Sequence, residues 1–282
     1  MEKITIRVPA TTANLGPGYD CLGIALDIAN RVTIALGSVG ELPPIVADAG
    51  RAFFAAAKIE PLAYRWNIEG EVPRSRGMGS SVTVRLGVLH GLNELAGKPF
   101  DPTQLFELCA QLEGHPDNAA PAAFGGFTVA RAGSETMRCE VAPELRFILL
   151  IPDFEVSTPE ARRILPDTIP RRDAVLSATN ACRITAAFLQ KRYDLLRGAF
   201  ADGLHQPYRE PLVPFLSAAI AAGEKAGALG GFLSGSGSTI CCLTLENEHD
   251  VANAMLETAP PGTHLVTTSA DNAGTVVMTN DE

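Results

Sequence analysis

The sequence predicts a globular chain that mixes β-strands and α-helices, and three observations support this class. Its 282 residues suit one large domain or two domains of ordinary size. Its composition, 46% hydrophobic and 20% charged, is typical of chains that bury a core. Short segments with alternating apolar residues are interleaved with longer segments of helical spacing, and residues 141–146 are the predicted domain boundary.

The first predicted elements are strands. Apolar residues at positions 4, 6 and 8 predict a strand that ends at Pro9, and residues 10–23 read as a compact loop of small residues, glycine and proline. Asn14 and Asp20 in this loop either face a ligand or bond the backbone, and both interpretations stay open. Further predicted elements are a strand at 31–36, a turn-rich stretch at 37–45 and a helix at 47–57.

Residues 73–81, PRSRGMGSS, lie between an alternating segment and a segment of helical spacing. A strand, a glycine-rich turn and a helix in this order direct backbone N–H groups at an anion. Gly77 and Gly79 can adopt positive φ, and Ser80 or Ser81 can cap the helix while a remaining hydroxyl contacts a phosphate or a metal ion. An ordinary capped helix explains the same residues, so this turn alone does not assign a site.

A dense polar cluster follows the helix predicted over residues 102–112. His115, Asp117 and Asn118 lie within four positions, next to two prolines and in an apolar neighbourhood. A capped turn explains one of these side chains but not all three, so the cluster favours a functional role.

The second half of the chain continues the mixed pattern. Ser157 or Thr158 is predicted to cap a helix on which Thr158 and Arg162 share a face, and residues 174–190 predict a helix buried on two faces. Arg209, at a helix end, is either an anion contact or a charge on the helix dipole. The last predicted elements are a Gly/Ser hairpin at 230–240, a helix at 251–259 and a strand at 274–278.

Charge and cysteine spacing exclude several classes of protein. The net charge of −9 argues against a nucleic-acid surface, which needs a basic face. The six cysteines have no CxxC spacing and no histidine cluster, which argues against a zinc site and favours thiols in a reducing compartment. The N-terminus alternates like a strand rather than a signal peptide, and no apolar run is long enough to span a membrane. We therefore expect a cytoplasmic protein without membrane or nucleic-acid partners.

Three stretches together resemble one family. Residues 9–23, 73–81 and 234–239 resemble the three signature motifs of the GHMP small-molecule kinases. The stretches EGHPDN, PDFEVSTPEAR and LHQPYREPL are similar to the homoserine kinase branch of that family and occur in its order. Several residues depart from the pattern: Tyr19 replaces a usual Phe, Ser238 a usual Pro, and Val82 and Thr83 usual small residues. Arg85 lies on a normally apolar helix.

The resemblance implies a two-domain α+β fold. Residues 1–144 would form an ATP-binding domain like ribosomal protein S5, and residues 145–282 would form a ferredoxin-like domain. ATP would lie in the first domain and the acceptor in the cleft between the two. The sequence leaves open whether the chain forms a homodimer.

The resemblance also implies ATP- and Mg²⁺-dependent phosphorylation of the hydroxyl of L-homoserine, a step toward threonine. The implied residues are, for ATP, Pro73, Arg74, Gly77, Met78, Gly79, Ser80 and Ser81; for Mg²⁺, Ser80, Ser81 and Glu107; for homoserine, Asn14, Asp20, His115, Asp117, Arg162 and Arg209; and for catalysis, Asn118 and Thr158. Two alternatives remain: a GHMP kinase for another small alcohol, and a non-catalytic sensor of the amino acid or nucleotide.

Overall fold

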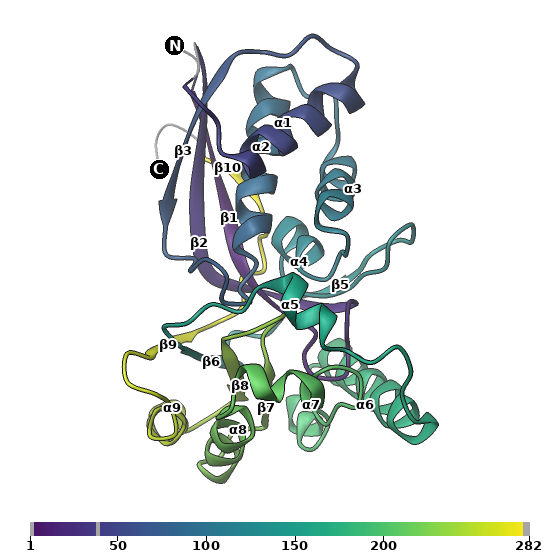
Figure 1. Cartoon of the computed structure of the whole chain (residues 1–282), viewed down its shortest axis with the longest axis vertical. Helices are drawn as coiled ribbons and strands as arrows, with labels where there is room; N and C mark the ends of the chain where they lie inside the picture. Colours follow the sequence, from purple (N-terminus) through teal and green to yellow (C-terminus); the bar gives the residue numbers. More distant parts are fainter. Residues whose placement is uncertain (1–2, 38–39, 279–282) are drawn as a thin grey trace.

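The computed structural model describes residues 3–37 and 40–278, arranged as two sheet-and-helix layers joined end to end (Figure 1). Residues 38 and 39 of the predicted turn-rich stretch lie outside the described residues. So do residues 1–2 of the first predicted domain and residues 279–282 of the second.

The first sheet has six antiparallel strands in the order β10-β1-β2-β4-β5, and β3 also pairs with β2. Its strands are β1 (Lys3–Ala13), β2 (Leu22–Leu36), β3 (Tyr64–Gly70), β4 (Phe127–Val129), β5 (Met137–Cys139) and β10 (Val276–Met278). Because β10 comes from the end of the chain and pairs with β1, this sheet contains both early and late residues. The predicted division at residue 144 stays a prediction.

Four helices cover one face of this sheet (Figure 1). They are α1 (Pro44–Ala57), α2 (Ser80–Leu95), α3 (Pro102–Glu113) and α4 (Ala119–Phe124). Ile6 and Val8 of β1 pack with Val32 and Ile34 of β2 against the apolar residues of these helices. The alternation of apolar residues in β1 therefore places them on the face of the sheet that packs against the helices, as a period of two predicts.

The second sheet has four antiparallel strands in the order β7-β8-β6-β9. These strands are β6 (Arg146–Ile151), β7 (Gly230–Leu233), β8 (Ile240–Thr244) and β9 (His264–Thr268). The helices around them are α5 (Thr158–Arg163), α6 (Arg171–Leu189), α7 (Gln206–Arg209), α8 (Leu216–Lys225) and α9 (Glu248–Leu256), with 3₁₀ turns η1 (Tyr193–Leu196) and η2 (Glu210–Leu212). This is the split β-α-β arrangement of ferredoxin-like domains, and the predicted α+β class is confirmed.

Strand β6 explains how the two layers join. Phe147 and Leu149 face a core that also contains Leu22 and Leu26 of β2, whereas Ile148 and Leu150 face α8 and α9 on the other side. A strand buried on both faces reads as a continuous apolar run, as this one does. The shared apolar core fixes the two layers against each other.

Several predicted elements need correction. The first strand does not end at Pro9 but continues to Ala13 through a register shift after Pro9, because these small residues run into the junction between the layers. Helix α6 is not buried on two faces, since Val175, Leu176 and Leu189 are exposed. The predicted hairpin is confirmed by the pairing of β7 with β8, and β9 was not predicted. Within residues 3–37 and 40–278, no helix is long and apolar enough to cross a membrane.

Candidate active site

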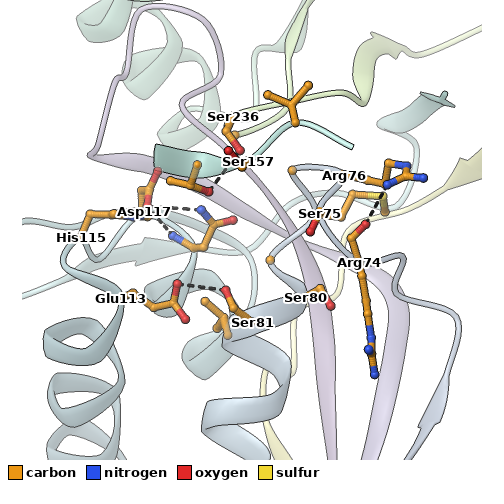
Figure 2. Close-up of a pocket in the computed structure, with 18 of the residues that line it drawn as sticks. Arg74, Ser75, Arg76, Ser80, Ser81, Glu113, His115, Asp117, Ser157 and Ser236 are labelled. Carbon is orange, nitrogen blue, oxygen red and sulfur yellow. Dashed lines mark hydrogen bonds and ion pairs between the residues drawn. The ribbon is translucent and has the colours of Figure 1, made fainter. Parts of the chain in front are cut away.

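A cavity of about 500 Å³ lies where the two layers meet. The N-terminus of α2 and the loop before it form one wall, and α5, the end of α7 and the turn after β7 form another. Figure 2 shows side chains from both layers directed into this space. The pocket therefore brings together motifs that are far apart in the sequence.

Helix α2 begins without a side-chain cap. Its N-cap is Gly79, in the left-handed conformation with φ 67°, and no side chain accepts a hydrogen bond from the first turn. The prediction that Ser80 or Ser81 caps this helix is wrong, because both serines lie inside the helix. The free N–H groups and the positive end of the helix dipole face the pocket, which makes this end a place for an anion.

Glycine is required at two positions of the loop before α2. A Cβ on Gly77 would lie 2.1 Å from the carbonyl oxygen of Ser234, and a Cβ on Gly79 would lie 2.2 Å from Oγ1 of Thr11. Both residues also have φ near +70°. The loop is thus packed tightly between the first strand and the turn after β7, which fixes its backbone.

The serine pair has a carboxylate partner, but it is not Glu107. Oγ of Ser81 donates to Oε2 of Glu113 at 3.0 Å, and Nη1 of Arg85 forms an ion pair with the other carboxylate oxygen (Figure 2 shows the Ser81–Glu113 contact). Glu107 is exposed and does not line the pocket. The two residues share α3, but six positions at about 100° per residue place their side chains about 120° apart around the helix. The carboxylate beside Ser81 is therefore that of Glu113, at the end of α3, whereas the resemblance implied Glu107.

Opposite α2, the pocket wall carries acidic groups. The side-chain ligand atoms of Asp20, His115 and Asp117 all lie within 4.8 Å of one another. Nδ1 of His115 lies 2.6 Å from Oδ1 of Asp117, which is 2% exposed. This hydrogen bond raises the pKa of His115 above its usual value, although burial opposes the shift. A wall of this kind attracts a cation.

Two arginines complete this end of the pocket. Arg162 contacts Asp20 through both guanidinium Nη atoms, at 2.7 and 3.0 Å. Arg209 is 2% exposed and donates to the carbonyl oxygens of Ala161 and Gly235 and to Nδ1 of His205. Its Nη2 makes no hydrogen bond within the described residues and is left for a ligand. Paired guanidinium groups are suited to a carboxylate.

His205 is neutral and contacts Arg209, with its Nδ1 3.1 Å from Nη1 of the arginine. Burial lowers its pKa to about 4, and its Nε2 lies 2.8 Å from the carbonyl oxygen of Gly16. Because Arg209 can only donate, Nδ1 of His205 is the acceptor and Nε2 carries the proton. The tautomer is therefore fixed by its two neighbours.

The predicted catalytic residues lie between the two ends. Oδ1 of Asn118 accepts a hydrogen bond of 2.7 Å from Oγ1 of Thr11, and its backbone N–H donates to Asp117. Thr158 begins α5 and lies 3.4 Å from the hydroxyl of Ser236. Asn118 is thereby held in one orientation, with its Nδ2 3.3 Å from Oδ1 of Asp117.

Comparison with known proteins gives consistent matches. Residues 45–126 match the model of the GHMP kinases N-terminal domain, and residues 184–260 match that of the GHMP kinases C-terminal domain. The homoserine kinase of Aquifex aeolicus is 38% identical, with 90% of this chain and 91% of the relative aligned. That of Deinococcus radiodurans is also 38% identical, over 98% and 97%. The chain belongs to the GHMP kinase family.

A solved structure agrees with this assignment. The crystal structure of homoserine kinase from Cytophaga hutchinsonii matches with a TM-score of 0.89 and 26% identity, covering 99% of this chain and 98% of that one. Mevalonate kinase structures match at 15% identity, which shows the fold alone.

Most residues predicted for the site line one pocket. They are Asn14, Asp20, Arg74, Gly77, Met78, Gly79, Ser80, Ser81, His115, Asp117, Asn118, Thr158, Arg162 and Arg209. Pro73 and Glu107 do not line it. Asn14 lines the pocket, but its amide is occupied within the protein: Nδ2 donates to Gly235 and Oδ1 accepts from the N–H of Asp20.

Sequence reasoning missed several residues of this site. Glu113 lies two positions before His115, and this closeness to the polar cluster at 115–118 was the available signal. Thr11 lies in the first motif but looked like an ordinary small residue of a loop. Trp66, Pro43 and Ile45 line an apolar end of the pocket, and no local pattern connects them.

Proposed function

We propose that this chain catalyses the ATP-dependent phosphorylation of the side-chain hydroxyl of L-homoserine, a step toward threonine. One observation carries the proposal: a single pocket joins an uncapped helix N-terminus, suited to phosphates, to a wall of carboxylates and arginines, suited to an amino acid. Full-length relatives that are named homoserine kinase support it.

The nucleotide phosphates would lie at the N-terminus of α2. Backbone N–H groups there and the hydroxyl of Ser80 would donate to them, and Arg74, exposed at the pocket wall, would add positive charge. The base would lie against the apolar end of the pocket, where Trp66 offers an aromatic face.

The oxygen donors near Ser81 fit Mg²⁺. A hydroxyl and a carboxylate are hard ligands of the kind that this ion prefers, and the two oxygens are 3.0 Å apart. Ser81 and Glu113 would hold the ion, with Ser80 beside them. When bound, Mg²⁺ supplies charge neutralisation for the phosphates. Arg85 occupies one oxygen of Glu113, so the other oxygen is the one offered to the ion.

The acceptor would bind as an α-amino acid. Asp117 is buried, and its Oδ1 already accepts three hydrogen bonds, so Oδ2 would face the ammonium group together with Asp20. Arg162 and Arg209 would bind the carboxylate. His115 orients Asp117, and Asn14 fixes the loop that carries Asp20.

Transfer in this site depends on position rather than on a strong base. The Asn118 amide cannot usefully accept a proton at neutral pH, but its Nδ2 could orient the attacking hydroxyl. The hydroxyl oxygen forms a bond to the γ-phosphorus as the bond to the ADP oxygen breaks. The helix N-terminus and Thr158 would stabilise the charge on the transferred group.

We also propose that the protein acts in the cytoplasm. All six cysteines are free, and three of them are buried, which fits a reducing compartment.

A coupled ADP-release assay tests the function. We expect turnover with L-homoserine and little with L-serine, L-threonine or mevalonate. Turnover with another alcohol but not with homoserine would make the chain a kinase for a different substrate. Calorimetric binding of homoserine without any binding of ATP·Mg²⁺ would indicate a sensor.

A further inference from the structure

Tyr19 lies at the centre of the acceptor end, although it is not a charged residue. Its ring stacks on His205, with centroids 5.2 Å apart and an angle of 30° between the planes. The guanidinium carbons of Arg162 and Arg209 lie 5.6 and 5.3 Å from the centroid of the same ring. Its hydroxyl accepts a hydrogen bond of 3.0 Å from Nη1 of Arg162.

The two guanidinium groups come from different elements, α5 and α7, and carry the same charge. Arg209 is buried and held by three acceptors, whereas the side chain of Arg162 is 37% exposed and held by Asp20 alone apart from Tyr19. Repulsion between the two cations favours movement of the more exposed one into solvent. The negative face of an aromatic ring offsets this repulsion for both cations at once.

The phenol is suited to this task. Burial raises the pKa of Tyr19, so its oxygen stays protonated and neutral near two arginines. The hydroxyl directs Nη1 of Arg162, while Asp20 accepts from both Nη atoms of the same group. The geometry of Arg162 is therefore set from two sides.

We propose that Tyr19 is a positioning residue that holds Arg162 and Arg209 around one ring, where both can bind the same carboxylate group, and that it thereby selects acceptors that carry an α-carboxylate. This inference rests on the proposed function, because it assigns the two arginines to the carboxylate of the acceptor. It predicts that the contribution of Tyr19 disappears for an acceptor without that group.

The test uses Tyr19→Phe, which removes the hydroxyl, and Tyr19→Leu, which removes the ring. We expect the KM for L-homoserine to rise about threefold in the first and about tenfold in the second, with kcat within about twofold. For 3-aminopropan-1-ol, which is homoserine without its carboxylate, we expect KM to change by less than about twofold in both.

Tyr193→Phe is the matched control. Its hydroxyl accepts a buried hydrogen bond from the N–H of Ala142, outside the pocket, so its loss is expected to lower thermal stability without changing either KM. Equal losses for both acceptors in the Tyr19 variants would contradict the proposal and indicate a general loop defect. Unchanged KM values in Tyr19→Leu would also overturn it.

A second measurement does not depend on turnover. L-2-aminobutyrate carries the ammonium and carboxylate groups of homoserine but no hydroxyl, and its binding can be followed by calorimetry. We expect about tenfold weaker binding to Tyr19→Leu than to the unaltered protein. If the unaltered protein binds this ligand but phosphorylates no alcohol, the proposed function fails and the role of Tyr19 is still tested. Equal affinity for both proteins would refute that role.

Discussion

The two ends of the pocket are formed by different parts of the chain: one mainly by backbone groups, the other mainly by charged side chains. The end at α2 is built from backbone: two glycines at positive φ, an uncapped helix and a loop packed against Thr11 and Ser234. The opposite end is built from charged side chains contributed by the first motif, the 115–118 cluster, α5 and α7. A site built from backbone depends on the conformation that the main chain can adopt. A site built from side chains depends on the chemical groups that those side chains carry. The two ends should therefore respond to different kinds of substitution.

The largest effect is expected at the backbone end. Gly79→Ala introduces a Cβ 2.2 Å from Oγ1 of Thr11 at a residue with φ of +67°. The loop and the start of α2 must shift, and a displacement of about 1 Å at a reacting group costs about a hundredfold in rate. We expect kcat/KM to fall by about a hundredfold or more, measured in the ADP-release assay.

Gly97→Ala is the control for that substitution. Gly97 also has positive φ, +80°, but a Cβ there would meet no atom within 4 Å. We expect a stability loss of about 1 kcal/mol and unchanged kinetics. If the two alanine variants were equally active, the activity would not depend on the close packing of the loop before α2.

Among the side chains at the backbone end, Glu113 offers the sharpest test. Glu113→Gln keeps the shape but removes the charge that Ser81 and Arg85 contact. We expect the Mg²⁺ concentration for half-maximal activity to rise by between about tenfold and a hundredfold. Glu107→Gln, on the same helix but exposed, should leave the Mg²⁺ titration unchanged. The reverse result would restore Glu107 as the ligand.

Arg209 tests the side-chain end. Arg209→Lys keeps the charge but cannot satisfy the acceptors on Ala161, His205 and Gly235 with the same planar fork. We expect about a tenfold rise in the KM for homoserine. The KM for ATP should not change.

Arg197→Lys is the matched control, because Arg197 also donates to two carbonyl oxygens, those of Ala228 and Gly227, away from the pocket. An equal change in both KM values for Arg209→Lys would mean that the two ends are not separate.

The same difference decides what could be predicted from the sequence. Gly77, Gly79 and the serine pair lie within five positions, so local steric rules mark this stretch as a candidate anion-binding turn, although an ordinary capped helix explains it equally. Arg162 and Arg209, by contrast, lie far from Asp20 in sequence, and each alone had an ordinary explanation. Only the resemblance to a family placed them together.

Other features of the molecule could not be predicted because tertiary contacts decide them. The first strand continues past Pro9 because residues 10–13 pair with residues 23–26 of β2, which sequence analysis did not assign to a strand. Glu107 and Glu113 lie on the same predicted helix, and which of them faces the pocket depends on the helix rotation set by the core contacts of Leu105, Phe106 and Cys109. A helical period gives the faces of a helix but not what each face meets.

The smallest effect concerns the part of α2 behind the backbone end. His90 lies two and a half turns from Ser81, and its Nε2 is buried with no hydrogen-bond partner within the described residues. Burial lowers its pKa to about 4, below its usual value of 6.5. Between these two values the unfolded chain binds a proton that the folded chain does not, so stability decreases as the pH falls from 6.5 toward 4.

His90→Leu removes both the unpartnered nitrogen and the proton linkage. We expect urea denaturation to show a gain of about 1 kcal/mol at pH 7.5 and a larger gain at pH 5, with kcat and both KM values unchanged. Replacement of the exposed His249 by Leu is the control, and it should not give the gain at pH 7.5, because no buried nitrogen is removed. If His90→Leu instead changed the KM for ATP, the backbone end would extend along α2 beyond its first turn, and the contrast between the two ends would weaken.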